Sequence, residues 1–300
     1  MITHRETDPA QKCKATSKTP MDRGAFRNYT DPDRRSTVEQ HYRLMRTNQT
    51  VEYVHRMHAK YAPLRHGRMT MREALMCLRE YVDASDPDIA LPNLAHAYQT
   101  AAAMREAGEP EWMQVTGLVH DVGKLMFLWG DASDGQQGGA DAPQWGLSGD
   151  TWVVGCALPA ALVFPQFNML SPDASDARYN TECGMYARGC GIQSLLFAWG
   201  HDEYLYQVLL RDRCARASSG TPLLPDEALA MVRLHSAYAW HEGGAYAWAE
   251  RPEDAATKAA VRRFNRYDLY SKCDKHWDEE VLWSEFGELL DRYFPQPLLW

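Results

Sequence analysis

Four histidines lie in apolar stretches of the sequence, where a polar side chain is costly to bury. An unpaired imidazole in such surroundings costs from about 0.5 to about 3 kcal/mol. Imidazole is also the commonest side-chain ligand of divalent transition metals, and ligands from separate helices can meet in the core of a bundle. Four such histidines therefore indicate a metal site. The stretches are LPNLAHAYQTAAA around His96, VTGLVHDVGKLM around His120, LLFAWGHDEYLY around His201 and LAMVRLHSAYAW around His235.

Carboxylates accompany two of these histidines. Asp121 directly follows His120, and Asp202 directly follows His201. Neighbouring side chains on a helix point about 100° apart. Both members of such a pair can therefore reach one site only where the site lies between the two directions. A carboxylate placed there can bridge two metal ions with its two oxygens. We predict that Asp121 forms the bridge, because Lys124 follows one turn later and its ammonium can reach the same site.

A distant aspartate completes the candidate ligands. Asp268 lies in VRRFNRYDLYSK, where Val261, Phe264 and Leu269 predict a buried helix face. A buried carboxylate without a partner is destabilising, so a metal ion or another cation should lie beside Asp268. The other seven histidines have mostly polar neighbours and are predicted to lie on solvated faces. The predicted metal ligands are therefore His96, His120, Asp121, His201, His235 and Asp268.

Apolar residues recur with helical periodicity through most of the chain. The alternation of apolar and polar residues that is typical of strands is scarce. One long helix is predicted to end at about residue 61, and Thr70-x-x-Glu73 is a capping box that starts the next. Asn93 is predicted to cap a third helix, and a fourth follows Pro110. We therefore predict an all-α fold, a single helical bundle around a dinuclear metal site with few or no short strands. Later helices are predicted over 192–212, 225–241, 255–271 and 278–293, and a short strand within 151–167.

Two segments lack helical periodicity. Residues 1–22 are polar and are predicted to form a disordered N-terminal tail. Residues 131–148 are rich in Gly, Asp and Gln, and we expect a flexible surface loop that metal binding does not need. Residues 23–300 then form a single domain.

The composition excludes several classes of protein. The 300 residues carry a net charge of −8, and no run of Lys and Arg marks a surface for nucleic acid. The longest nearly apolar run, 153–164, has about twelve residues, whereas a membrane helix needs roughly twenty. No apolar segment of a secretory signal opens the sequence, and the seven cysteines contain no CxxC pair. We therefore expect a cytoplasmic protein with reduced thiols that binds neither nucleic acid nor a membrane. We also expect a monomer, although composition does not determine the oligomeric state.

The order of His96, the pair His120-Asp121 and a distant Asp268 resembles the HD-domain superfamily of helical metalloproteins. Longer blocks are similar to the myo-inositol oxygenase family, and the resemblance extends over about residues 26–300. Two of them, AWGHDEYLY and RLHS, are specific to that family within the superfamily. The blocks are FRNYT at 26–30, SDPD at 85–88, HAYQTA at 96–101, LVHDVGK at 118–124, GDT at 149–151, VGC at 154–156, GMY at 184–186, AWGHDEYLY at 198–206, RLHSAYAWHEGG at 233–244 and FNRYDLYSK at 264–272.

The resemblance implies an HD-domain-like fold and a diiron oxygenase. Such an enzyme cleaves the C1–C6 ring bond of myo-inositol with O2 to give D-glucuronate. The implied cofactor is two iron ions, a mixed-valence Fe(II)/Fe(III) pair in the active state. The implied ligands are His96, His120 and Asp268 for one iron, His201 and His235 for the other, and Asp121 as the bridge.

The resemblance also implies a substrate pocket for myo-inositol. Lys124 corresponds to the family lysine that contacts the substrate and is the implied catalytic side chain. Inositol is neutral and covered with hydroxyl groups, so its site needs carboxylate and backbone acceptors and a few donors. The implied substrate-binding residues are Arg27, Asp83, Ser85, Lys124, Gly149, Asp150, His235 and Ser236.

Two alternatives remain open at this point. An HD-type metal-dependent phosphohydrolase acting on a nucleotide or phosphomonoester would have the same fold, although few arginines surround the motifs. A non-catalytic helical protein with core histidines would bind no metal. Two departures from the family pattern affect the pocket: segment 131–148 is longer than expected, and Ala84 stands where an acidic residue is expected.

Overall fold

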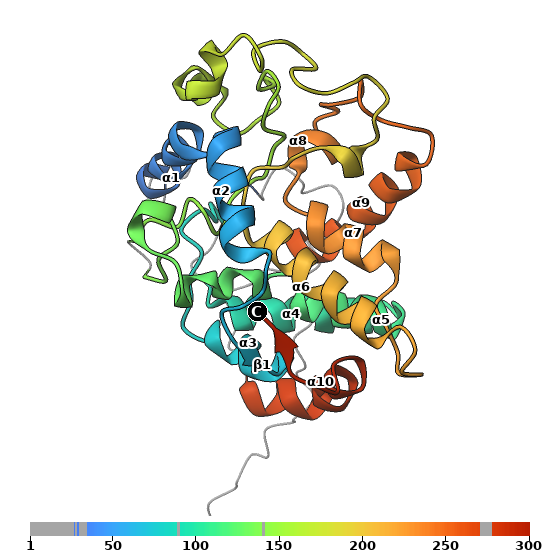
Figure 1. Ribbon diagram of the computed structural model, residues 1–300. Coiled ribbons are helices and arrows are strands. Elements are labelled where there is room, and N and C mark those ends of the chain that lie inside the picture. The colour runs from blue at the N-terminus through green and yellow to red at the C-terminus, as the bar shows by residue number, and fades with distance from the viewer. Residues whose placement is uncertain (1–26, 28, 30–34, 89–90, 140–141, 271–277) are drawn as a thin grey trace, which may run out of the picture.

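The computed structural model describes residues 27, 29, 35–88, 91–139, 142–270 and 278–300, so the predicted tail 1–22 lies outside the described residues. The described residues form ten α-helices, several short 3-10 helices and one small antiparallel sheet (Figure 1). The prediction of an all-α fold is confirmed. The helices are α1 (Arg35–Asn48), α2 (Val51–Tyr61), α3 (Met71–Cys77), α4 (Asn93–Glu106), α5 (Glu111–Val119), α6 (His201–Arg216), α7 (Asp226–Leu234), α8 (Tyr238–His241), α9 (Asp254–Tyr270) and α10 (Glu279–Tyr293), and the strands are β1 (Arg68–Met69) and β2 (Leu298–Leu299).

Side-chain caps determine where several helices begin. Thr70 and Glu73 form the predicted capping box of α3, in which each side chain accepts a hydrogen bond from the backbone N–H of the other residue. Thr50 accepts a hydrogen bond from a backbone N–H in the first turn of α2. The long helix predicted to end near residue 61 is therefore two helices. Asn93 does not cap α4 as predicted but is its first residue, with a buried side chain.

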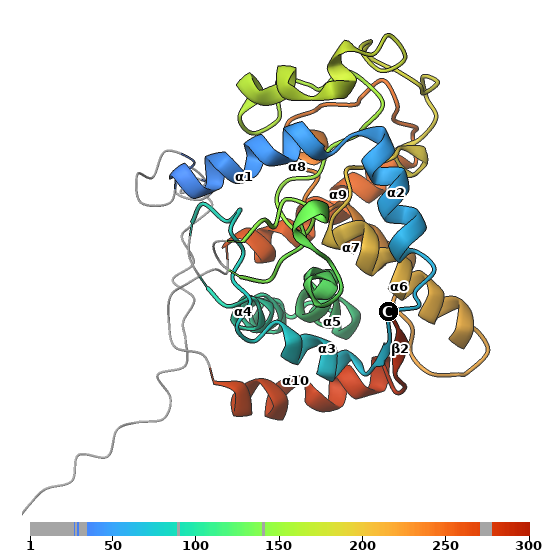
Figure 2. The same cartoon turned by 60° about the vertical axis from the view of Figure 1, so that its left-hand side comes forward.

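The helices surround one extensive hydrophobic core. Helix α4 packs against α5, α6 against α7, and α7 against α9, while α10 contacts α3 and α5. Figure 2 shows α1 on the side of the molecule opposite α10. The largest side chains that are fully buried in this core are Trp152, Trp199, Trp240 and Trp300.

The four histidines from the apolar stretches lie at or near helix ends. His201 is the first residue of α6, and His96 lies in the first turn of α4. His120 and His235 directly follow the last residues of α5 and α7. The last carbonyl groups of a helix have no partner within the helix. Carbonyl oxygens are therefore available beside His120 and His235.

Segment 131–148 differs from the expected surface loop, because several of its residues are buried. The amide side chain of Gln144 accepts a hydrogen bond from the Ala84 backbone N–H (3.0 Å) and donates one to the Val82 carbonyl (3.1 Å). The segment is thus attached to the chain on both sides of Asp83. An amide can satisfy buried backbone groups in this way, which composition alone does not reveal. The buried residues are Asp134, Gly135, Gln136, Gln144, Trp145, Gly146, Leu147 and Ser148.

Residues 151–199 contain little regular structure beyond three short 3-10 helices, η4 (Pro165–Leu170), η5 (Pro172–Ser175) and η6 (Ile192–Ser194). The strand predicted within 151–167 is reduced to a single bridge between Val153 and Phe197. In the part of the chain that the structure describes, no helix combines the length and apolarity needed to cross a membrane. The described cysteines are free, as expected for reduced thiols: Cys77, Cys156, Cys183, Cys190 and Cys214.

Gly123 allows the 3-10 helix η2 (Val122–Leu128) to lie directly against the start of α6. A Cβ atom at this position would lie 2.1 Å from the backbone oxygen of His201. We expect Gly123→Ala to destabilise the fold by about 1–3 kcal/mol, as overpacking does, and to lower Tm by several degrees in calorimetry. Gly67→Ala is the matched control, because a Cβ atom there meets nothing within 4 Å. Equal Tm values for the two variants would contradict the expectation that a Cβ atom at position 123 clashes with the His201 backbone.

Candidate metal centre and adjoining pocket

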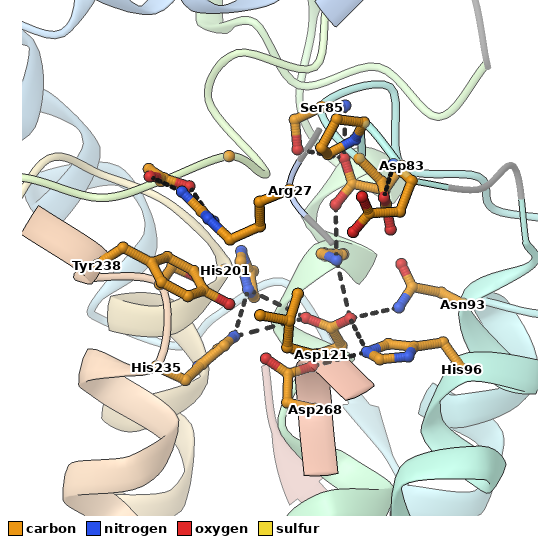
Figure 3. Close-up of a pocket in the computed structure, with 18 of the residues that line it drawn as sticks. Arg27, Asp83, Ser85, Asn93, His96, Asp121, His201, His235, Tyr238 and Asp268 are labelled. Atoms are coloured by element: carbon orange, nitrogen blue, oxygen red, sulfur yellow. Dashed lines mark hydrogen bonds and ion pairs between the residues drawn. The ribbon is translucent and has the colours of Figure 1, made fainter. Parts of the chain in front are cut away.

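The structure brings the six predicted metal ligands together in the core, and all six are buried. Figure 3 shows His96, His201, His235 and Asp268 around the carboxylate of Asp121. Some of their nitrogen and oxygen atoms lie close enough together to share an ion. The groups that satisfy this condition among the described residues are His96–His120–Asp268, His120–Asp121–His235 and His201–Asp202–His235.

The first group consists of His96, His120 and Asp268. Asp268 Oδ1 lies 2.9 Å from His96 Nε2 and 3.2 Å from His120 Nε2. Asp121 Oδ2 lies 3.9 Å and 3.6 Å from the same two nitrogens. Ligand atoms at about 2.1 Å from one ion are about 3.0–3.4 Å apart in octahedral or tetrahedral geometry. The distances within the first group therefore suit one shared ion.

The second group faces the other oxygen of Asp121. His201 Nε2 lies 3.1 Å from His235 Nε2 and 3.1 Å from Asp121 Oδ1. His235 Nε2 lies 3.8 Å from the same oxygen. Asp121 thus presents Oδ2 to the first group and Oδ1 to the second. This is the arrangement of a carboxylate that bridges two metal ions.

Backbone carbonyl groups fix the direction in which three of the imidazoles point. A carbonyl oxygen can only accept a hydrogen bond, so each contacted Nδ1 carries the hydrogen. In a neutral ring, Nε2 then presents its lone pair toward the centre, and this is how a metal-binding histidine is held. The contacts are His120 Nδ1 to Gly117 O at 2.8 Å, His201 Nδ1 to Leu147 O at 2.7 Å and His235 Nδ1 to Val232 O at 2.9 Å.

Metal ions bound in the centre would remove the repulsion between these lone pairs, which point toward one another. His120 Nε2 is buried and has no hydrogen-bond partner among the described residues. The Nε2 atoms of His201 and His235 face each other across 3.1 Å. Buried polar atoms without partners are rare and costly, and mixed imidazole and carboxylate donors suit transition metals. The residues present therefore fit a metal cofactor.

Proton affinities in the centre are strongly shifted. Burial disfavours the charged imidazolium of His201, but the carboxylates of Asp202 and Asp121 outweigh burial and raise its pKa to about 10. Burial also opposes ionisation of Asp121, yet the Lys124 ammonium holds the pKa of that carboxyl well below its usual range. The same ion pair raises the pKa of Lys124 despite its burial. Protons and metal ions therefore compete for the same nitrogens.

Lys124 connects the metal centre to the pocket beside it. Its Nζ lies 2.8 Å from Asp121 Oδ2 and 2.8 Å from Asp83 Oδ2. Asp83 also accepts hydrogen bonds from the backbone N–H and the Oγ of Ser85, at 2.7 and 2.5 Å. The amide of Asn93 donates to Asp121 Oδ2. Two donors therefore hold this oxygen of the bridging carboxylate in place.

Arg27 and Asp150 form another wall of the pocket. The two terminal nitrogens of Arg27 donate to the two carboxylate oxygens of Asp150 at 3.0 and 2.6 Å. The guanidinium carbon lies 3.6 Å from the centre of the Tyr238 ring, and Tyr42 Oη donates to Asp150 Oδ1 at 3.0 Å. Gly149 has a φ of +100°, a conformation that favours glycine. The turn before Asp150 therefore depends on this glycine.

The pocket is lined by all eight residues that the sequence predicts to bind substrate. Five of the six predicted metal ligands line it too, whereas His120 is not part of the lining. The metal centre therefore forms the inner end of a polar pocket. The eight residues are Arg27, Asp83, Ser85, Lys124, Gly149, Asp150, His235 and Ser236.

Segment 131–148 contributes directly to this centre. The Leu147 carbonyl accepts hydrogen bonds from both the backbone N–H (2.9 Å) and the Nδ1 (2.7 Å) of His201. A carbonyl that orients a candidate ligand is part of the metal centre. The expectation that metal binding does not need this segment stays a prediction, and the contact between Leu147 and His201 argues against it.

Several residues around the site were not predicted from the sequence. His41 and His241 were predicted to be solvated, yet both are buried. Their Nε2 atoms lie 3.1 Å from the Ser148 carbonyl and 3.0 Å from the His235 carbonyl. Tyr238 and Asn93 were not recognised as lining residues. For Tyr238, the available signal was its position two residues after Ser236.

Comparisons with known proteins agree on one family. Residues 35–300 match the family described as Myo-inositol oxygenase. The inositol oxygenase of Mus musculus is 41% identical over 278 residues, which cover 92% of this chain and 91% of that protein. That of Homo sapiens is 40% identical over 281 residues (93% and 92%), and that of Sus scrofa is 38% identical over 300 residues (99% and 100%). The chain therefore belongs to the myo-inositol oxygenase family.

Proposed function

We propose that this chain is an oxygenase that uses O2 to cleave the C1–C6 bond of myo-inositol and yields D-glucuronate. Family membership supports this reaction. The observation that carries the proposal is the Asp121 carboxylate, whose oxygens face two pairs of histidines at the inner end of a polar pocket. One myo-inositol and one O2 give one D-glucuronate and one water. Four electrons thus pass from inositol to O2 without another reductant.

The proposed cofactor is a pair of iron ions, one Fe(II) and one Fe(III) in the active state. Iron would supply the redox chemistry with O2 and lower the pKa of a hydroxyl group bound to it. The carbonyl groups behind the histidine rings hold the ligand atoms in place before the ions bind. The proposed ligands are His96, His120 and Asp268 for one ion, His201 and His235 for the other, and Asp121 for both.

The charges around the pocket suit a neutral polyol better than a phosphate ester. Six aspartates line it against one arginine and one lysine, a net formal charge of −4 before any ion binds and with the histidines counted as neutral. Arg27 is paired with Asp150, and Lys124 with Asp83 and Asp121. A phosphate would meet two cations already engaged by carboxylates, whereas inositol hydroxyls can donate to those carboxylates. This charge distribution argues against the phosphohydrolase alternative.

Lys124 is proposed to position the substrate. An ammonium has three N–H donors, and two of them face Asp83 and Asp121. The third can donate to an inositol hydroxyl. Its raised pKa keeps Lys124 protonated, so it offers no lone pair to a metal ion. A fixed donor beside the centre orients the ring, which accelerates the reaction by positioning.

Oxygen uptake tests the proposed reaction most simply. Iron-loaded protein supplied with myo-inositol should consume O2 and form D-glucuronate in equal amounts. Protein stripped of metal by a chelator is the control and should do neither. Release of phosphate from a phosphomonoester, without O2 uptake on myo-inositol, would replace this proposal with the phosphohydrolase.

Asp121→Ala should lose both metal ions, because it removes an oxygen from each half of the centre. His235→Ala should mainly lose one ion, since it removes a nitrogen from one half. Asp134→Ala is the control, as Asp134 is a buried aspartate paired with Lys60 outside the centre. Metal analysis after iron loading measures the iron content of all three variants. Two irons retained in Asp121→Ala would rule out the bridging role.

Metal loading should release protons. The neighbouring carboxylates raise the pKa of His201 to about 10 in the metal-free protein, so its ring carries a proton at pH 8. A metal-bound ring cannot keep that proton. Metal affinity should therefore rise as the pH increases toward about 10. Calorimetric titration with Co(II) in buffers of different ionisation enthalpy counts the protons released, and heats that are equal in all buffers would contradict this prediction.

Lys124→Ala should keep two irons and lose most turnover, because it removes a substrate donor but no metal ligand. We expect kcat/KM for myo-inositol to fall by roughly 100-fold, the effect of a lost positioning contact. Lys60→Ala is the matched control, since Lys60 pairs with Asp134 outside the pocket. Near wild-type kcat/KM in Lys124→Ala would make Lys124 a bystander.

A further inference from the structure

His41 on α1 is a buried histidine to which the proposed function gives no role. Its Nε2 atom lies 3.1 Å from the backbone oxygen of Ser148, which is buried too. Ser148 directly precedes Gly149 and Asp150, two residues that line the polar pocket. The contact therefore joins α1 to turn 148–150 in the wall of the pocket.

The imidazole of His41 is a neutral donor in this contact. Burial lowers its pKa, although the nearby Asp83 carboxylate opposes this effect. The ring is therefore neutral at physiological pH and carries one hydrogen. Because a carbonyl oxygen only accepts hydrogen bonds, this hydrogen is on Nε2, which donates to Ser148. The contact thus needs no second buried cation near Lys124.

Two adjacent side chains of α1 hold the turn at both of its ends. His41 holds the Ser148 carbonyl, and Tyr42 Oη accepts a hydrogen bond from the backbone N–H of Asp150 at 3.2 Å. Gly149, which lies between them, makes no backbone hydrogen bond to another described residue. Backbone groups rarely stay unpaired away from water, so those of Gly149 are available to the hydroxyl groups of a ligand.

The turn packs so closely on α1 that its conformation depends on the side chain at position 41. A Cβ atom on Gly149 would lie 3.1 Å from His41 Nε2 and 2.7 Å from Met45 Sδ. A buried carbonyl that loses its donor is costly, so the Ser148 peptide should turn toward another donor when His41 is replaced. Gly149 and Asp150 would then move with it.

Filling of space does not explain why a histidine occupies this position. His41 also lines a separate cavity between the start of α1 and segment 142–145, so its ring is not tightly enclosed. A flexible apolar side chain such as methionine could fill the same space. What the imidazole adds is a donor for the Ser148 carbonyl.

We propose that His41 is a positioning residue, which holds turn 148–150 in the conformation in which Gly149 and Asp150 bind a neutral polyol. The inference rests on the proposed function for the identity of the polyol as myo-inositol. His41 is not part of the pocket lining, so it acts on the substrate through the Ser148 carbonyl.

A matched pair of variants separates the donor from the space that it fills. His41→Gln keeps an N–H donor on a flexible side chain, whereas His41→Met has a similar length and no donor. In iron-loaded protein, His41→Met should raise KM for myo-inositol by roughly tenfold, the effect of one lost hydrogen bond, and change kcat much less. His41→Gln should restore KM. His66→Leu is the control, since His66 stacks on Trp129 outside the pocket.

Hydrogen–deuterium exchange of the iron-loaded protein without substrate gives a readout that does not depend on activity. Amides in peptides that cover 145–151 should exchange faster in His41→Met than in the wild type or His41→Gln. Both variants should keep two irons. If His41→Met does not fold, His41→Ala replaces it as the variant without a donor.

Wild-type KM or wild-type exchange in His41→Met would overturn the proposal. Failure of His41→Gln to restore both properties, or loss of iron from His41→Met, would overturn it too, because His41 would then have a general structural role. No O2 uptake on myo-inositol by the wild type would instead contradict the proposed function. The exchange measurement would still decide whether His41 holds the turn.

Discussion

The Asp121 carboxylate is the group on which the rest of the site depends, because each of its oxygens faces a different pair of imidazoles. Negative oxygens and nitrogen lone pairs repel one another at these distances in a buried, weakly screened interior. Cations must therefore hold the centre together. In the metal-free protein these are protons, as the raised pKa of His201 indicates. When metal ions replace the protons, their binding free energy adds to the stability of the core.

Backbone groups near helix ends fix the positions of the side chains that must bind these cations. The carbonyls near the ends of α5 and α7 hold His120 and His235, and the Leu147 carbonyl holds His201 at the start of α6. Gly123 lets η2 approach the backbone of His201 closely, which brings the two candidate ligand pairs together. The same backbone groups that end the helices thus orient the ligands. Because these backbone partners are rigid, the ligand side chains need to move little when an ion binds.

The sequence was sufficient to predict the all-α class and the six candidate ligands that meet in the core. Histidines in apolar stretches are costly unless paired, so their types and positions carried the information. The contributions of Asn93 and Leu147 could not be predicted, because they depend on contacts between distant segments. Asn93 resembles a helix cap, and segment 131–148 has the composition of a loop. Only tertiary packing shows that one donates to Asp121 and the other orients His201.

Anomalous X-ray diffraction from crystals of the iron-loaded protein would show whether two metal ions lie on either side of Asp121. Data collected on both sides of the iron absorption edge locate the ions independently of any assay. We expect two iron peaks, each bonded to a different oxygen of Asp121. One peak should contact His96 and His120, and the other His201 and His235. A single peak, or two peaks that do not share Asp121, would contradict it.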